Sequence, residues 1–174
     1  MTTPPLPIAA VVYPPALDIG AFMRTAAAAL AGRGVRLGGV VQHDARPNPD
    51  DPCAMSLEDL ASGTRFTLSQ DLGSGSSACR LDPGALAQAA VAVRAAIEQG
   101  ADLVIFNKFG AQEAAGGGLR AEMGMAAARG IPVLTAVAER LTGDWERFTG
   151  DPATVLPPDL DAVLAWWQAV RTAR

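Results

Sequence analysis

Basic stretches and long apolar stretches are both missing from this 174-residue sequence. The formal net charge is −4 with a pI of about 4.9, and without a basic run nothing predicts nucleic-acid binding. No apolar run approaches the ~20 residues of a membrane span. The head at residues 1–7 lacks the positive charge and the apolar segment of a signal peptide. We therefore expect a bacterial-type cytoplasmic protein without membrane insertion.

Cysteine is scarce too: Cys53 and Cys79 are the only two, and His43 is the only histidine. Because no export signal is expected, free thiols are favoured over a disulfide. The three side chains together would offer soft metal ligands, although their spacing matches no standard zinc pattern and a fourth ligand is missing. Cys79 would act as a nucleophile only beside a base, and His43 is the only imidazole. Whether the cysteines are paired, free or metal-bound stays open.

The remaining composition is that of a folded protein, with 49% hydrophobic and 18% charged residues in a length that suits one domain. Short apolar runs without alternation take turns with helical patterns, which is typical of an α/β fold with a mainly parallel sheet flanked by helices. We expect strands at 8–13, 35–42, 102–107, 131–137 and 153–156, and helices at 19–31, 86–99, 119–129, 139–148 and 159–171. The prediction is a single α/β domain over residues 1–174 with a disordered head at 1–7.

Residues 55–60 and 64–69 differ from these runs because apolar and polar side chains alternate in both. Ala61, Ser62 and Gly63 between them are typical of a turn. We therefore expect an inserted β-hairpin at 54–69, either as a flap or as an extension of the sheet.

The most distinctive segment is 70–83, which concentrates glycine, serine and one arginine ahead of an alanine-rich helix. Glycines leave main-chain N–H groups open to an anion, serine hydroxyls add donors, and a guanidinium presents a fork suited to oxyanions. The predicted anion-binding residues here are Gly73, Ser74, Gly75, Ser76, Ser77 and Arg80. The alternative is an ordinary surface loop in which Asp82 and Pro83 begin the next helix.

A second polar segment, 107–120, follows the clearest predicted strand. Ligands bind beyond the carboxyl ends of parallel strands, so we expect it to meet segments 13–18, 42–43 and 70–82 there. Its candidate anion-binding residues are Lys108, Gly116, Gly117, Gly118 and Arg120, and the candidate acids or cation ligands at this edge are Asp71, Asn107 and Glu113. The alternative is that Asn107 and Glu113 satisfy backbone groups at the turn and that the triple glycine is a flexible connection.

The segment after the first strand, 13–20, lies where a nucleotide-binding protein carries its phosphate loop. It has no lysine and no Ser or Thr at the required place, and Pro14 and Pro15 remove N–H donors. The neutral Asn107 stands where phosphotransfer needs a magnesium-binding acid. The next helix N-terminus still attracts anions, but Asp18 at its cap opposes them. We expect no working phosphate loop, which favours a binding protein over an enzyme.

Several stretches together resemble an uncharacterised bacterial family, domain of unknown function 2478, often encoded beside molybdate-transport genes. The resemblance spans residues 8–167 and rests on 10–13, 38–42, 53–57, 69–73, 79–82 and 107–113. Its most specific parts read Cys79-Arg80-Leu81-Asp82 and Asn107-Lys108-Phe109-Gly110-Ala111-Gln112-Glu113. The family distantly resembles small phosphate-loop nucleoside-triphosphatases, which implies a degenerate version of their fold. Its gene neighbourhood implies a role in molybdenum or tungsten handling and names no reaction.

Three functions are compatible with these features. The first is a molybdate- or tungstate-type oxyanion-binding protein for storage, buffering or delivery, with charge-assisted hydrogen bonds of about 1.5–3 kcal/mol each. The second is a divergent nucleotide-binding protein or NTPase of molybdate transport, which would bind nucleotide with Mg²⁺ and use Glu113 or Asp71 as its acid. The third is a non-enzymatic partner of a transporter or regulator, with the hairpin and Trp167 as its surface, since Trp166 is expected in the core. A homo-oligomer is also expected.

Overall fold

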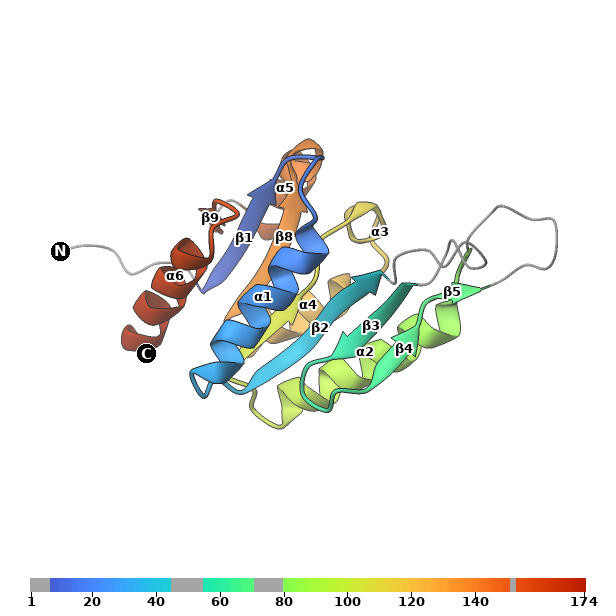
Figure 1. Cartoon of the computed structure of the whole chain (residues 1–174), viewed down its shortest axis with the longest axis horizontal. Coiled ribbons are helices and arrows are strands. Elements are labelled where there is room, and N and C mark those ends of the chain that lie inside the picture. The colour runs from blue at the N-terminus through green and yellow to red at the C-terminus, as the bar shows by residue number, and fades with distance from the viewer. Residues whose placement is uncertain (1–6, 45–54, 71–79, 151–152) are drawn as a thin grey trace.

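The computed structural model describes residues 7–44, 55–70, 80–150 and 153–174, and its main sheet lies between two layers of helices (Figure 1). Helices α1 (Ile19–Gly32) and α6 (Leu160–Thr172) cover one face of the sheet. Helices α2 (Pro83–Glu98), α4 (Arg120–Ala128) and α5 (Thr142–Thr149) cover the other. The short helix α3 (Ala111–Ala114) and the 3-10 turn η1 (Glu139–Leu141) lie at one end of the sheet. Among the described helices, none is long and apolar enough to cross a membrane.

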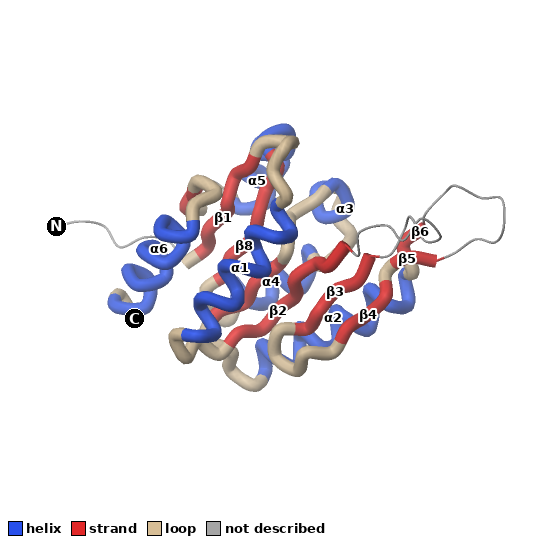
Figure 2. The backbone as a smooth tube through the Cα atoms, viewed as in Figure 1, coloured by secondary structure: helices blue, strands red, loops and turns tan. Residues whose placement is uncertain are grey.

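The main sheet runs in the order β4-β3-β2-β7-β8-β1-β9 (Figure 2). Its strands are β1 (Ile8–Tyr13), β2 (Leu37–Asp44), β3 (Met55–Asp59), β4 (Arg65–Thr67), β7 (Leu103–Phe106), β8 (Val133–Ala138) and β9 (Thr154–Leu156). From β2 to β9 each neighbouring pair is parallel, whereas β2–β3 and β3–β4 are antiparallel. The predicted mainly parallel α/β sheet is therefore present. The β3–β4 hairpin extends it, and β5 (Ser69–Gln70) with β6 (Arg80–Leu81) forms a separate ladder.

Helix α2 begins at Pro83, three residues before the predicted start at residue 86. The Asp82 carboxylate accepts hydrogen bonds from the N–H groups of Gly84, at 2.9 Å, and Ala85, at 3.4 Å. Pro83 fits the first turn because its fixed φ is helical and its missing N–H is not needed there. For Asp82 and Pro83 the structure therefore matches the alternative given above, in which these two residues begin the next helix.

Alternation along each strand divides the core between the two faces of the sheet. Ala10 and Phe106 face α2 and α4, while their neighbours Ala9 and Ile105 face α1 and α6. The first face also holds an aromatic group in which Phe109 lies 5.2 Å from Trp145 and 5.4 Å from Phe148, measured between ring centroids. This group fixes α5 against the end of β7.

The prediction that Trp167 points away from the core is wrong. Trp166 and Trp167 are 4% and 6% exposed, and both belong to the core on the α1 side. Adjacent residues of a helix point about 100° apart, so one flat contact would bury only one of them. Helix α6 contacts α1 as well as the sheet, and this corner buries two sides of the helix. Trp167 is therefore no part of a free surface.

Gly39 in the middle of β2 has φ of 95° and lies opposite Ile105 of β7. A Cβ atom at this position would overlap the backbone carbonyl of Ile105. Only glycine combines that φ with so close an approach of two strands. The β2–β7 pair, which carries Gln42 and Asn107 at its carboxyl end, is held in register by this contact.

Candidate functional site

A cavity of about 330 Å³ opens at the carboxyl edge of the parallel strands, on the face covered by α2. The apolar part of its lining consists of Val40, Met55, Leu57, Leu68, Leu86, Phe106, Leu119, Ala138 and Leu141. The polar part of its lining consists of Tyr13, Gln42, Asn107, Lys108, Gln112, Glu113 and Arg140, together with Gly110 and Ala111 of the same segment. An apolar pocket with a few polar groups at one end is the usual form of a small-molecule site.

Two exposed cations, Lys108 and Arg140, stand at the rim of this cavity. Lys108, the only lysine in the sequence, follows β7, and Arg140 follows β8 in the turn η1. Toward the residues that the structure describes, neither side chain makes a hydrogen bond or an ion pair. Both positive charges are therefore available to a ligand.

Tyr13, the only tyrosine, ends β1 and is 9% exposed against the same cavity. Burial raises the pKa of its phenol above the ordinary value of 10.0, and the positive charge of Arg140 partly offsets this. The hydroxyl therefore stays protonated at neutral pH and serves as a hydrogen-bond donor. Tyr13, Lys108 and Arg140 bring three donors from three adjacent strands to one cavity.

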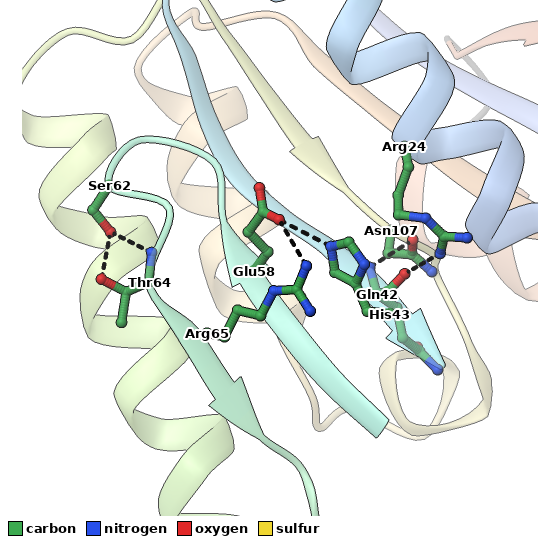
Figure 3. Close-up of polar contacts among 8 residues, drawn as sticks. All are labelled: Arg24, Gln42, His43, Glu58, Ser62, Thr64, Arg65 and Asn107. Atoms are coloured by element: carbon green, nitrogen blue, oxygen red, sulfur yellow. Dashed lines mark hydrogen bonds and ion pairs between the residues drawn. The ribbon is translucent and has the colours of Figure 1, made fainter. Parts of the chain in front are cut away.

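Asn107 ties the ends of β7 and β2 together (Figure 3). Its Oδ1 accepts the backbone N–H of Gln42 at 2.9 Å, and the guanidinium of Arg24 donates to the Gln42 carbonyl at 2.6 Å. The paired residues of β2 and β7 end at Val40 and Phe106, before Gln42 and Asn107 are reached. Beyond that point, side chains supply the hydrogen bonds that a neighbouring strand would make. The structural alternative given above for Asn107 matches this geometry.

Glu113 is also held by backbone groups. Its Oε2 accepts from the N–H of Gly110 at 3.1 Å and its Oε1 from that of Leu119 at 3.5 Å. The Gly116 and Gly117 N–H groups donate to the carbonyls of Glu113 and Gln112, at 3.1 and 2.8 Å. These contacts close the segment from α3 to α4 into a compact loop. The N–H groups of Gly116 and Gly117 are therefore used in hydrogen bonds within this loop.

Gly118 lies in this closed loop and Arg120 is the first residue of α4, and neither lines the cavity. Gly118 has φ of 58°, and a Cβ there would lie 2.5 Å from Glu113 Oε1. The guanidinium of Arg120 donates to the Glu113 carbonyl at 3.1 Å and lies 4.8 Å above the centre of the Phe148 ring. Of the predicted anion-binding residues in segment 107–120, the cavity gathers Lys108 alone.

His43 does not line the cavity, and by alternation along β2 it faces the same side of the sheet as Val41, opposite to α2. Its Nε2 is 2.9 Å from Glu58 Oε1, and Arg65 is 3.8 Å from the same oxygen (Figure 3). In the described ranges, no three His, Cys, Asp or Glu side chains come together as metal ligands would. Outside the described residues lie Cys53, Asp71, Gly73, Ser74, Gly75, Ser76, Ser77 and Cys79. Arg80 is described only as a backbone partner of Gln70 in β6, so the anion-binding loop stays a prediction.

The loop after β1 has the shape of a tight turn rather than of a phosphate loop. Leu17 N–H donates to the Pro14 carbonyl at 3.1 Å, and the Asp18 carboxylate caps α1 through Ala21 N–H at 3.0 Å. A second cavity of about 280 Å³ lies against this loop. It shares the wall residues Tyr13, Gln42, Asn107 and Lys108 with the first cavity.

Sequence reasoning missed Arg140 and gave Tyr13 no role. The rule that ligands bind beyond the carboxyl ends of parallel strands applies equally to predicted strand 131–137, and Arg140 is the first cation after it. The apolar inner part of the cavity had no comparable sequence pattern, because it is assembled from β2, the hairpin and α2 together.

Comparison with known proteins gives three results. A family model described as "Protein of unknown function (DUF2478)" matches residues 8–166. Over 161 residues the chain is 43% identical to the molybdenum import ATP-binding protein ModC 2 of Bradyrhizobium diazoefficiens, a match that covers 92% of this chain and 18% of that protein. The solution structure of a human cancer-related nucleoside triphosphatase matches with a TM-score of 0.59 and 15% identity, covering 96% of this chain and 97% of that one. The last result confirms the predicted P-loop NTPase-like α/β fold.

Proposed function

We propose that this chain, which belongs to the family of proteins of unknown function DUF2478 as the resemblance indicated, is a nucleotide-binding protein of molybdate import. In this proposal the chain binds nucleotide without hydrolysing it. The P-loop NTPase-like fold and the similarity to a molybdenum import ATP-binding protein both support a nucleotide as ligand. Since the chain spans only 18% of that relative, the transport role itself is part of the proposal.

The observation that carries the proposal is the 330 Å³ cavity with Lys108 and Arg140 at its rim and an apolar interior. An apolar interior suits a flat base, because burying its faces removes apolar surface from water at about 25 cal/mol per Å². Cations at the rim suit phosphate, since charge-assisted hydrogen bonds are roughly twice as strong as neutral ones. A nucleotide uses both parts of the cavity.

Binding without turnover is supported by what the site lacks. The loop after β1 offers neither the lysine nor the hydroxyl that hold phosphates and Mg²⁺ in a phosphate loop. Asn107 is uncharged, and the two oxygens of Glu113 accept backbone N–H groups. An NTPase that used Glu113 as its acid would have to break these contacts first. We propose that the bound nucleotide sets the affinity of this chain for a transporter or regulatory protein.

Calorimetric titration with ATP, ADP and AMP, with and without Mg²⁺, tests the proposal, together with an assay of phosphate release. We expect binding of at least one nucleotide and no release of phosphate above the buffer rate. A ligand at about a hundred times its Kd adds roughly 2.7 kcal/mol to the free energy of unfolding, so thermal unfolding gives an independent reading. Absence of binding by both methods would refute the nucleotide proposal.

A molybdate- or tungstate-type oxyanion is the second candidate ligand, and the observation that favours it is the three donors of Tyr13, Lys108 and Arg140. Storage, buffering or delivery of the metal would follow from such binding. A bare dianion makes no use of the apolar interior, which is why we place this candidate second. Molybdate and tungstate that raise the unfolding temperature while sulfate does not would reverse the order. The homo-oligomer expected from the sequence also remains a proposal, which light scattering tests.

A further inference from the structure

The larger cavity has two chemically different ends. The apolar end is lined by buried side chains from β2, β3, the residue after β4, β7 and the residue before α4: Val40, Leu57, Leu68, Phe106 and Leu119. The polar end is lined by Tyr13 and by the cations Lys108 and Arg140, from the ends of β1, β7 and β8. A ligand that fills the cavity therefore has an uncharged flat part and an anionic part, joined in one molecule.

The positive charges at the polar end indicate how much negative charge the ligand carries. Lys108 and Arg140 together carry two positive charges, which match one phosphate group at neutral pH. Glu113 also lines the cavity, but its carboxylate is directed to the N–H groups of Gly110 and Leu119. A longer phosphate chain would extend into the neighbouring cavity, where it meets the carboxylate of Asp18. Like charges oppose such an extension.

From these two ends we infer that the ligand is a nucleoside monophosphate, with its base in the apolar end and its single phosphate bound by Tyr13, Lys108 and Arg140. The inference rests on the proposed nucleotide-binding function and narrows it to one phosphate and one place. It moves the phosphate away from the loop after β1, where the fold usually holds it, to the ends of β7 and β8. The cavity volume, at the lower end of the range of about 300–1,000 Å³ for ligand pockets, suits a compact ligand.

Calorimetry with four probes separates the two ends: AMP, adenosine, inorganic phosphate and ATP–Mg²⁺. We expect AMP to bind more tightly than each of the other three, with GMP run in parallel to read the choice of base. Lys108→Ala and Arg140→Ala should each weaken AMP by at least about tenfold, the loss expected for one charge-assisted hydrogen bond. The same variants should leave the affinity for adenosine unchanged. Leu86→Gln, at the apolar end, should weaken AMP and adenosine alike.

The matched control is Arg171→Ala, which removes an exposed arginine from the last turn of α6, outside both cavities. Its affinity for AMP should equal that of the unaltered protein. A second reading uses the fact that Lys108 is the only lysine. Its ε-amine is the single side-chain amine that an acylating ester can modify, and peptide mass spectrometry reports its rate of modification. AMP should slow this modification, whereas adenosine should not.

The outcomes distinguish the two proposals. If ATP–Mg²⁺ binds more tightly than AMP and keeps its affinity in Lys108→Ala and Arg140→Ala, nucleotide binding stands and the assigned place and ligand class are overturned. If no nucleotide binds and none protects Lys108, the proposed function fails as well. Tight binding of phosphate alone, equal to that of AMP, would overturn the assignment of the apolar end to a base.

Discussion

Two loops at the carboxyl edge of the sheet invite comparison: the one after β1, at residues 14–18, and the one after β7, at residues 107–110. In a P-loop NTPase-like fold the first is expected to hold phosphate, yet here it is a proline-containing turn that ends in the acid Asp18. The second carries Lys108, which is free of partners among the described residues, beside the uncommitted Arg140 after β8. The cations of the candidate site thus stand one and two strands away from the loop after β1, with Arg140 following β8 and Lys108 following β7.

The loop after β7 has more polar side chains than the loop after β1, but most of them already make structural hydrogen bonds. Asn107 holds Gln42, and Glu113 holds Gly110 and Leu119. What remains for a ligand is one ammonium group on a rigid support. A polar residue at a sheet edge therefore indicates function only where its side chain is not already used in structural hydrogen bonds.

Removing the Asn107 side chain should give the largest loss. Asn107→Ala leaves the Gln42 N–H without its acceptor at a site only 5% exposed, which should lower the free energy of unfolding by about 1–3 kcal/mol. Urea denaturation measures this loss. The control Gln112→Ala removes an exposed amide from the same region and should change the free energy by less than about 0.5 kcal/mol. Equal losses in the two variants would contradict the structural role of Asn107.

Replacing Glu113 should have a smaller effect, because Glu113 is only partly buried whereas Asn107 is 5% exposed. Glu113→Ala removes the acceptor of the Gly110 and Leu119 N–H groups and should lower the free energy of unfolding by about 1 kcal/mol. Glu113→Gln keeps one acceptor oxygen and should lose less. Neither variant should change phosphate release, since the proposed protein has none. A measurable hydrolytic activity that Glu113→Gln removes would make Glu113 catalytic and weaken the contrast between the two loops.

Asp18 should matter least among the three carboxyl or carboxamide groups. It is exposed and accepts one N–H, that of Ala21, so Asp18→Ala should lower the free energy of unfolding by about 0.5–1 kcal/mol. Asp18→Ser restores a cap without the charge and should regain most of this loss. If the loop after β1 opposes phosphate through Asp18, the serine variant should also bind ATP–Mg²⁺ more tightly in calorimetry. Unchanged ATP affinity would remove Asp18 from the explanation.

At neutral pH the smallest effect belongs to Tyr13, whose raised pKa keeps its phenol protonated. Because the folded protein holds this proton more tightly than the unfolded chain, its contribution to stability is present below pH 10 and is lost as pH rises above that value. Near-ultraviolet absorbance reports the phenolate of this single tyrosine and should titrate above 10.0. Arg140→Ala should raise the midpoint further, since Arg140 lowers this pKa. A midpoint below 10 would contradict the burial of Tyr13.

The sheet and its helices could be predicted from the sequence because they depend on local patterns. Unbroken apolar runs marked the parallel strands, and the alternation in 55–60 and 64–69 marked strands that became β3 and β4. The helix N-caps could also be predicted from the sequence, as Asp82 and Asp18 illustrate. Local patterns failed where burial depends on a third element. Trp167 is buried only because α6 lies in the corner between α1 and the sheet.

The candidate site was predicted only in part, for the same reason. Lys108 could be found because it follows a strand, and Arg140 was open to the same rule. The use of Asn107 and Glu113 in backbone bonds was foreseen only as an alternative, since it depends on how far β2 extends beyond β7 and on where α4 begins. The apolar interior joins residues from Val40 to Leu141, and no sequence window contains such a set.

Because the two cavities share a wall, ligands bound in both at once would be thermodynamically linked. Tyr13, Gln42, Asn107 and Lys108 face both spaces, so a ligand in one cavity acts on groups that a ligand in the other also meets. Linkage requires that the factor by which the first ligand changes the affinity for the second equals the factor in the opposite direction. An anion in the smaller cavity would compete for the ammonium of Lys108 and give negative cooperativity.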